Sequence, residues 1–402
     1  MYTPTVGIVA EYNPFHKGHL YHMEQARKIS GADAVVVVMS GPFVQRGEPA
    51  LIDKWQRARM ALAAGANLVL ELPAVFAAHN AGVFASSAVD ILFSTGVVTH
   101  ISFGVESPNW RIDKTLNILL EEPPCFKAFL QNFLKKGYSF VEARSLALEE
   151  MLPGSANELR GANNTLALSY MLQIHKKKLK LTPVPVKRKG AGYHETGVLG
   201  FASATGVRKK LIEGKTSEAL KLLPESSAEI LRENLKNGRC CIDNSRLWDL
   251  LRATLLRCSP EEIAAHAEIG EGIENRLKKE ALNSKSYEEW ASRCTSKRYP
   301  RGRIQRHAVH LLLGLEHWTN RAFQRLGPAC IRVLAADAKG RNLLKEMRKK
   351  STLPAITRYG AASGGYAHRM TAFDVLAAEL WEQLIPNGEL GAEHTRQVII
   401  KQ

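Results

Sequence analysis

The sequence lacks the features of a membrane-spanning, disordered or fibrous protein. Its best apolar run, residues 61–78, is interrupted by Asn67, Glu71 and Pro73, whereas a spanning helix needs about 18 uninterrupted apolar residues. No basic segment followed by a short apolar stretch opens the chain, so we expect no signal peptide and a cytoplasmic location. With 402 residues, 45% hydrophobic and 23% charged, the composition is that of a globular protein of two or three domains.

Cysteine is scarce and scattered. None of the six cysteines forms a CxxC pair, and the adjacent Cys240 and Cys241 lack the spacing of zinc ligands. This pattern argues against a disulfide scaffold and a zinc ribbon. We expect buried or free thiols in a reducing compartment.

Acidic residues are too few to balance the basic ones, and the excess is uneven. The net charge is +16, yet the first 110 residues carry 7 basic and 8 acidic residues, which leaves 48 basic and 31 acidic residues in the remainder. A nearly neutral N-terminal part and a basic remainder indicate that a polyanion, most simply nucleic acid, binds the part of the chain after residue 110.

Short apolar runs alternate with helical patterns in the first hundred residues. Strands are predicted at 5–10, 34–39, 67–72 and 99–103, and helices at 19–29, 53–64 and 80–94. Strands that are apolar on both faces and alternate with helices predict an α/β fold with a Rossmann-like parallel sheet. Ligands of such sheets bind at the carboxyl ends of the strands.

The rest of the chain reads as mostly helical. We predict a helical insertion at about 107–155, a helix at 164–175 and a helix that starts near Ser203. Residues 181–186, interrupted by prolines, are predicted as an edge strand or a fifth strand. We place a domain boundary near residue 210. The chain is thereby divided into a nucleotide-binding domain, 1–210, and a mainly helical, basic domain, 211–402.

An HxGH motif follows the first predicted strand. His16, Gly18 and His19 lie where a helix begins, and a helix N-terminus binds phosphate through its free N–H groups. Two imidazoles three residues apart can both donate to phosphate oxygens. This suits stabilisation of the charge that develops at an α-phosphate while pyrophosphate leaves. The alternatives are two structural histidines, or a zinc site that also uses His22.

A second motif resembles the partner of HxGH. Ser203 and Thr205 are good N-cap residues, and Arg208 can reach the same phosphates. Together the two motifs resemble the HxGH and ISxTxxR pair of the nucleotidyltransferase superfamily. The resemblance implies catalytic roles for His16, His19 and Arg208. From the residues themselves we expect no metal ligand in the protein.

Longer blocks narrow the resemblance. The chain is similar to the tRNA(Met) cytidine acetate ligase family in GIVAEYNPFHKGHLYH (7–22), MSGPFVQRGEPALIDKW (39–55), KRKGAGYHE (187–195), FASATGVR (201–208) and KRYPRGRIQR (297–306). That family implies a two-step reaction. Acetate and ATP, expected with Mg²⁺, give acetyl-adenylate, and the acetyl group then passes to N4 of wobble cytidine C34 of elongator tRNA(Met).

The resemblance also implies a set of ATP-binding residues. They are Gly7, Ile8, Val9, Ala10, Glu11, Tyr12, Asn13, Pro14, Phe15, His16, Lys17, Gly18, His19, Leu20, Gly104, Asn163, Arg188, Ser203 and Thr205. Asn164 is an alternative to Asn163, and either asparagine could instead be a helix cap. Gly104 could equally be a turn glycine, and Arg188 part of a solvated basic loop.

The chain departs from the family pattern at Pro42, where Asn is usual, and in NNTLA (163–167), where NNILG is usual. Gln45 and Arg46 are candidates for contacts with acetate or the tRNA end. Glu11 and His194 are candidates for the general base of acetyl transfer, and the sequence does not rank them.

A basic segment is the candidate tRNA contact. Its residues are Lys297, Arg298, Arg301, Arg303 and Arg306, with Tyr299 among them. Arginine makes bidentate phosphate contacts, and an aromatic ring can stack on an unpaired base. A second basic run, 176–180, could be only a solvated face.

Two other functions fit part of the sequence. One is a small-metabolite nucleotidyltransferase of the pantetheine-phosphate or nicotinate-mononucleotide type, which leaves the basic C-terminal residues unexplained. The other is a non-catalytic RNA-binding protein, against which the intact HxGH and ISxTxxR-like residues argue. The sequence does not give the oligomeric state.

Overall fold

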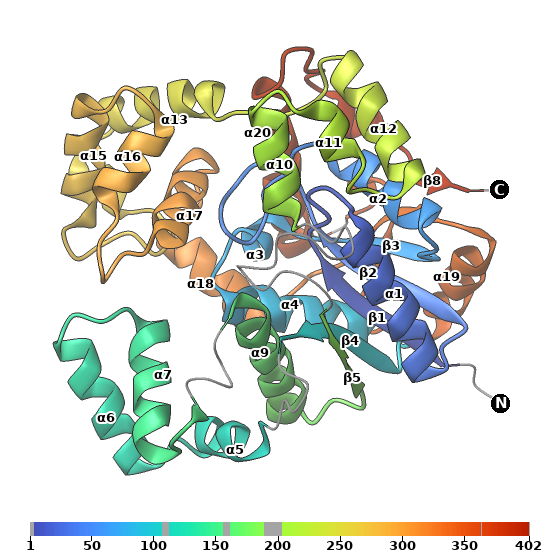
Figure 1. Cartoon of the computed structure of the whole chain (residues 1–402), viewed down its shortest axis with the longest axis horizontal. Helices are drawn as coiled ribbons and strands as arrows, with labels where there is room; N and C mark the ends of the chain where they lie inside the picture. Colours follow the sequence, from blue (N-terminus) through green and yellow to red (C-terminus); the bar gives the residue numbers. More distant parts are fainter. Residues whose placement is uncertain (1–3, 107–111, 156–160, 189–202, 363, 402) are drawn as a thin grey trace.

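A computed structural model describes residues 4–106, 112–155, 161–188, 203–362 and 364–401. The sheet at its centre has the strand order β5-β4-β1-β2-β3-β6-β7, with β8 paired to β6. Neighbours from β5 to β3 are parallel, and β6 runs antiparallel to β3. The predicted α/β fold with a mostly parallel sheet is confirmed (Figure 1).

The first half of the chain supplies the parallel part of the sheet and the helices that cover it. Its elements are β1 (Thr5–Ala10), α1 (Lys17–Ser30), β2 (Ala34–Ser40), α2 (Lys54–Ala63), β3 (Leu68–Leu72), α3 (Ala74–Ala77), α4 (Ala81–Ser94), β4 (His100–Val105), α5 (Asp113–Glu121), α6 (Pro124–Lys135), α7 (Phe140–Met151), α9 (Ala162–Lys177) and β5 (Thr182–Lys187). Each strand and helix predicted here is present, within two residues at either end, and the helical stretch after residue 111 contains α5, α6 and α7.

The second half begins with α10 (Ala204–Ile212) and is mainly helical. Its further elements are α11 (Thr216–Leu220), α12 (Glu225–Lys236), α13 (Ser245–Arg257), α14 (Pro260–Ala264), α15 (Ile273–Asn283), α16 (Tyr287–Cys294), α17 (Arg301–Leu312), α18 (His317–Leu326), β6 (Ile331–Ala336), α19 (Ala338–Lys350), β7 (Ala355–Ile356), the 3-10 turn η1 (Tyr359–Ala361), α20 (Gly365–Gln383), α21 (Ala392–Thr395) and β8 (Ile399–Ile400).

Three strands in this half were not predicted, and they join the sheet built by the first half. β6 pairs with β3, so the chain leaves the sheet after β5, builds the helices α10–α18 and returns. In Figure 1, α13–α17 stand to one side of the sheet, above the α5–α7 insertion. The division into domains near residue 210 stays a prediction.

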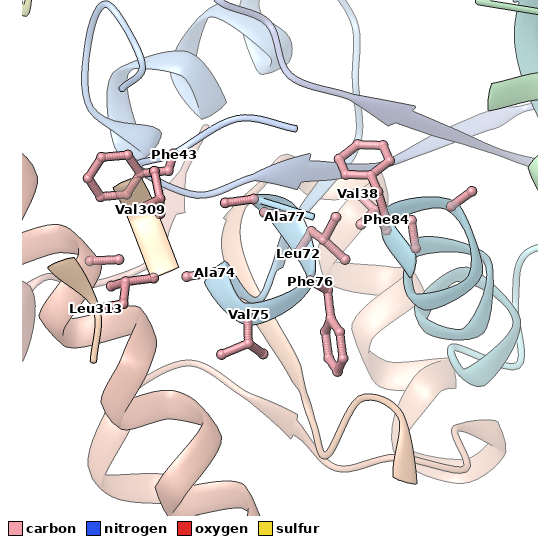
Figure 2. Packing of buried hydrophobic residues seen from close by; sticks show 14 of the residues in the cluster. Val38, Phe43, Leu72, Ala74, Val75, Phe76, Ala77, Phe84, Val309 and Leu313 are labelled. Atoms are coloured by element: carbon pink, nitrogen blue, oxygen red, sulfur yellow. The ribbon is translucent and has the colours of Figure 1, made fainter. Parts of the chain in front are cut away.

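Alternating side chains of the strands give the sheet a core on each face. Val35 and Val37 of β2 pack in the cluster that includes α1, α2 and α10–α12. Val36 and Val38 pack in the larger cluster with α4, α9 and α17, as the twofold side-chain period of a strand requires. Figure 2 shows part of this larger cluster, in which Phe43 and the α3 residues lie with Val309 of α17. The loop after β2 is therefore packed against the second half of the chain.

The strand order also locates a ligand-binding crevice. From β1 the chain proceeds through β2 to β3 on one side, and then crosses to β4 and β5 on the other. Ligands bind where the order reverses, outside the carboxyl ends of the strands. Residues 11–16 after β1 and Gly104 near the end of β4 lie at this reversal.

Candidate active site

The HxGH motif forms the first turn of α1, as predicted. His16 is the N-cap: its Nδ1 accepts from the Gly18 N–H at 3.0 Å, and His19 Nδ1 accepts in return from the His16 N–H at 3.2 Å. The two imidazoles stack, with centroids 3.7 Å apart and planes at 23°. Because each Nδ1 accepts a hydrogen bond, a neutral ring carries its proton on Nε2, where it is free to donate.

Burial keeps these imidazoles neutral. It lowers the pKa of His16 to about 3, and the nearby Arg188 guanidinium lowers it further. Burial, His16 and Arg188 hold the pKa of His19 well below its usual range. The pKa of His22, one turn further along α1, is lowered to about 4 by burial and by Arg188. The His22 Nε2 atom lies 3.1 Å from Ser102 Oγ. The site thus offers neutral N–H donors, not cations, at neutral pH.

Arg208 lies against the loop that precedes the motif. It donates from Nη1 to the Asn13 carbonyl at 2.8 Å and from Nη2 to Glu48 at 2.7 Å. Ser203 caps α10 by accepting from the Gly206 N–H at 3.1 Å. Thr205 lies in the first turn of this helix and is exposed. The helix start predicted near Ser203 is confirmed, and Arg208 is placed beside the HxGH loop.

Gly104, Asn163 and Arg188 come together at the other side of the reversal. Arg188, just after β5, donates to Asn163 Oδ1 at 2.9 Å, and Asn163 donates to Glu106 at 2.9 Å. A Cβ on Gly104 would lie 3.3 Å from Arg188 Cγ. The glycine therefore makes room for the arginine.

The two asparagines that the sequence left open differ in their surroundings. Asn164 is buried, and its Oδ1 accepts from the backbone N–H of Glu106 at 2.9 Å. Asn163 is half-buried, and its side chain accepts from Arg188 and donates to Glu106. This placement favours Asn163 as the residue that faces a nucleotide.

The predicted ATP-binding stretch is continuous in space. Gly7, Ile8, Val9 and Ala10 belong to β1, the loop carries Glu11 to His16, and Lys17 to Leu20 open α1. A Cβ on Gly7 would lie 2.7 Å from Leu92 of α4, so this glycine serves the packing of α4 on the strand. Contact of these residues with ATP stays a prediction.

Two buried polar atoms at this edge have no hydrogen-bond partner among the described residues. They are Asn13 Nδ2, in the HxGH loop, and Ser40 Oγ, at the end of β2. An unpaired buried donor is costly unless a ligand or water satisfies it. These atoms fit a site made for a polar ligand such as a nucleotide.

Several residues that shape the site were missed by the sequence reasoning. Arg57 of α2 is fully buried and donates to the carbonyls of Glu11, Ser40, Gly41 and Ile52 at 2.5–3.1 Å. Burial lowers its pKa to about 10. Glu48 holds Arg208. The only available signal for Arg57 was a basic residue among the small apolar residues of a predicted helix.

The loop after β2 links the nucleotide edge to the basic segment. The Gln45 N–H donates to Glu11 Oε1 at 3.0 Å, and its side chain donates to the His79 carbonyl at 2.7 Å. Gly47 has φ +77°, and a Cβ there would lie 2.5 Å from the backbone of Gln305 and Arg306 in α17. The loop tip therefore rests directly on α17.

The five basic residues of the candidate tRNA contact differ in how accessible they are to an RNA phosphate. Arg301 is exposed at the start of α17, and Lys297 Nζ lies 3.2 Å from the centre of the Tyr138 ring. Arg298 pairs with Glu271 at 2.5 Å. Arg303 lies over the Tyr299 ring at 4.5 Å. Burial lowers the pKa of Arg306, which is half-buried.

Tyr299 is not placed to stack on a base. It is only 6% exposed, and its hydroxyl donates to the Gly270 carbonyl at 3.0 Å. The expectation that an aromatic ring within the basic segment meets RNA is therefore wrong for this residue. RNA contact by the five basic residues stays a prediction.

Other sequence expectations concern metal, cysteine and membrane. In the described ranges, no three histidine, cysteine or acidic side chains are grouped to hold a metal. All six cysteines are free, and Cys125 alone among them is exposed. No helix in the part of the chain that the structure covers has the length and apolarity to span a bilayer. His194 lies outside the described residues.

The parallel sheet, the capped HxGH turn and the facing arginine define a HIGH-type nucleotidyltransferase, and the family model described as HIGH Nucleotidyl Transferase matches residues 3–396. The similarity extends further than this class. A tRNA(Met) cytidine acetate ligase of Acetivibrio thermocellus is 35% identical over 98% of this chain and 99% of its own. One of Caldanaerobacter subterraneus subsp. tengcongensis is 39% identical over 88% of both chains. The chain belongs to the tRNA(Met) cytidine acetate ligase family.

A solved structure agrees over the whole length. The crystal structure of Thermotoga maritima TmcAL bound with alpha-thio ATP has a TM-score of 0.92 with this chain, at 32% identity and 99% coverage of both. The expected family, fold and enzyme class are therefore confirmed.

Proposed function

We propose that this chain is an ATP-dependent ligase that activates acetate and acetylates a tRNA. In the first step, an acetate oxygen attacks the α-phosphorus of ATP, which gives acetyl-adenylate and releases pyrophosphate. In the second, N4 of wobble cytidine C34 of elongator tRNA(Met) attacks the acyl carbon, and AMP leaves. The names of the relatives and the ATP analogue bound by the Thermotoga maritima protein support this proposal.

The observation that carries the first step is the stacked pair of neutral histidines. Their Nδ1 atoms are engaged with the backbone, so their Nε2–H groups are available to the phosphate oxygens. Donors held in place before the reaction stabilise the charge that develops at the α-phosphorus without reorganisation. The free N–H groups at the start of α1 add a partial positive charge.

Two arginines supply full positive charge near the HxGH turn. Arg208 is fixed by Asn13 and Glu48, and Arg188 by Asn163. Both are suited to bind the triphosphate, and we assign Arg208 a catalytic role with His16 and His19. Mg²⁺ would be carried by the phosphate oxygens of ATP, since it is usually held through substrate phosphates with at most one or two carboxylates.

The second step needs positioning more than activation, because acetyl-adenylate is already a reactive acyl donor. The attacking amine loses a proton, and Glu11 is the described candidate to accept it. Its Oε1 accepts from the Gln45 N–H, and burial raises the pKa of its carboxyl group. The free thiols agree with action in a reducing cytoplasm.

Exchange of labelled pyrophosphate into ATP tests the first step. We expect exchange that requires acetate but no tRNA, and that is lost in His16→Ala and His19→Ala. It should survive in the control variant His266→Ala, which changes a half-buried histidine. Exchange supported by pantetheine phosphate or nicotinate mononucleotide instead of acetate would point to a small-metabolite enzyme. RNA binding without any exchange would point to a non-catalytic RNA-binding protein.

A further inference from the structure

Among the tryptophans that the structure describes, one is exposed in a way that the fold does not explain. Trp318 of α18 is 74% exposed, whereas Trp55, Trp248, Trp290 and Trp381 are at most 4% exposed. A large ring in solvent contributes little to the stability of the folded chain. Exposed aromatic rings are typical of surfaces that contact a partner.

The helix that carries this ring is firmly held on its other face. Asn320 and Phe323 are buried. The Phe323 ring lies 5.7 Å from Tyr366 and 5.8 Å from Phe373 of α20, centre to centre. The Trp318 ring is therefore presented by a rigid element, which lowers the entropic cost of binding.

Basic side chains lie beside the exposed ring. The Arg321 guanidinium lies 5.8 Å from the ring centre, and the His317 ring lies edge-on at 5.4 Å. Arg325 is exposed one turn beyond Arg321, and Arg369 of α20 is held nearby by donating to Thr319 Oγ1 at 3.0 Å. We call His317, Trp318, Arg321, Arg325 and Arg369 the Trp318 surface. Glu316, the N-cap of α18, is the acidic residue on this helix.

Hydrogen bonds connect α18 to the nucleotide edge of the sheet. The Gln324 side chain lies 3.1 Å from His79 Nε2, and the His79 carbonyl accepts from the Gln45 side chain. The Gln45 N–H in turn donates to Glu11, directly after β1. In Figure 1, α18 lies between α17 and α4. An RNA bound for reaction at this edge could therefore extend over α18.

We propose that the Trp318 surface binds the RNA substrate, with the Trp318 ring stacked on an unpaired base and the arginines on the adjacent phosphates. This inference rests on the proposed function. Stacking on an aromatic ring flanked by cations is a general mode of single-stranded RNA recognition. A second copy of this chain is a poorer occupant, because it would bring the same positive charge to the contact.

The test compares Trp318→Ala and Trp318→Phe with the parent chain. Leu282→Ala is the matched control, since Leu282 is 62% exposed on α15. Binding of unmodified elongator tRNA(Met) is measured by filter retention, and pyrophosphate exchange is measured without RNA. We expect Trp318→Ala to bind the tRNA roughly 5- to 100-fold more weakly, the range for loss of one base stack. Trp318→Phe should recover most of the binding, Leu282→Ala should match the parent, and exchange should stay unchanged in all three.

Several outcomes would overturn the inference. Parental tRNA affinity in Trp318→Ala would show that the ring does not contact RNA. A change in sedimentation from dimer to monomer in Trp318→Ala, with unchanged tRNA binding, would show that the ring serves a copy of this chain. If the parent neither binds nor acetylates the tRNA, the proposed function itself fails. That failure is separate, because it appears before any substitution is made.

Discussion

Substitution of Arg208 by glutamine tests whether the arginine of the second motif acts on the phosphates. The change removes the hydrogen bond from Nη1 to the Asn13 carbonyl at 2.8 Å and the ion pair with Glu48 at 2.7 Å. It leaves Glu48 as an unpaired carboxylate near the site of the triphosphate. The loss of the guanidinium charge and the repulsion between the Glu48 carboxylate and the triphosphate both oppose ATP activation.

The expected cost to catalysis is much larger than the cost to folding. The Arg208 and Glu48 side chains are 21% and 31% exposed, so loss of this partly solvated pair should lower the free energy of unfolding by about 1 kcal/mol. Loss of one fixed donor to a developing negative charge typically slows a reaction roughly 10²- to 10³-fold. Acetate-dependent pyrophosphate exchange should therefore fall by this factor in a chain that remains folded.

A neighbour on the same helix provides the control. Lys210 of α10 pairs with Glu218, and the described contacts link that pair to no residue of the HxGH loop. Lys210→Gln should leave the exchange rate near that of the parent and lower stability no more than Arg208→Gln does. Exchange by Arg208→Gln within about threefold of the parent would refute the role given to Arg208.

Three further predictions follow from the loop, the basic segment and the histidines. Gly47→Ala should lower the free energy of unfolding, measured in urea, by at least about 2 kcal/mol more than Gly31→Ala does. Both glycines have positive φ, but only Gly47 lies against the α17 backbone. Equal effects of the two substitutions would contradict the contact between the loop and α17. Neutralising Arg301 and Arg303 together should weaken tRNA binding and flatten its dependence on salt, with exchange unchanged; loss of both activities would mean that the segment supports the fold. Histidines whose pKa is lowered in the folded chain take up protons on unfolding below pH 6.5, so the free energy of unfolding should fall as the pH is lowered from 7.5 to 5.5. Each such histidine contributes at most about 1.4 kcal/mol per pH unit. A urea midpoint that does not change with pH would contradict the burial of these histidines. Six of the histidines that the structure describes are of this kind: His16, His19, His22, His79, His307 and His310.

The parallel sheet could be predicted because its signals are local. Each strand from β1 to β4 is an apolar run bounded by polar residues, and helices with their own caps separate the strands. Asp53 and Asn80 cap α2 and α4 as their position in the sequence suggests. β5 was expected as an edge or fifth strand, and it lies at an edge of the sheet, where its prolines are tolerated.

The antiparallel extension of the sheet could not be predicted in the same way. β6 is a short apolar run between two helices, and such a run is equally compatible with a buried helix. Its identity as a strand depends on pairing with β3, more than 250 residues earlier in the chain. β7 and β8 are two residues each and depend on β6.

For the candidate site, the local geometry of each motif could be predicted, but the contacts between distant segments could not. The HxGH turn is fixed by neighbouring residues, so its geometry follows from the motif. The hydrogen-bond partners of the Arg208 side chain, and all those of Arg57 except Ile52, are distant in sequence. No spacing rule links Arg208 to Glu48 or Tyr299 to Glu271. Burial of Tyr299, which removes it as a stacking ring, is a tertiary property that the basic segment itself does not reveal.

Transfer of labelled acetate to tRNA is the most direct test of the central claim. The parent chain and His19→Ala are incubated with ATP, isotopically labelled acetate and unmodified elongator tRNA(Met), and the nucleosides are then analysed by mass spectrometry. The account predicts label in N4-acetylcytidine with the parent chain and none with His19→Ala. Unlabelled cytidine with the parent chain, despite competent RNA and ATP, would contradict the acetate ligase function, and label that persists in His19→Ala would contradict the active site assigned to the HxGH motif.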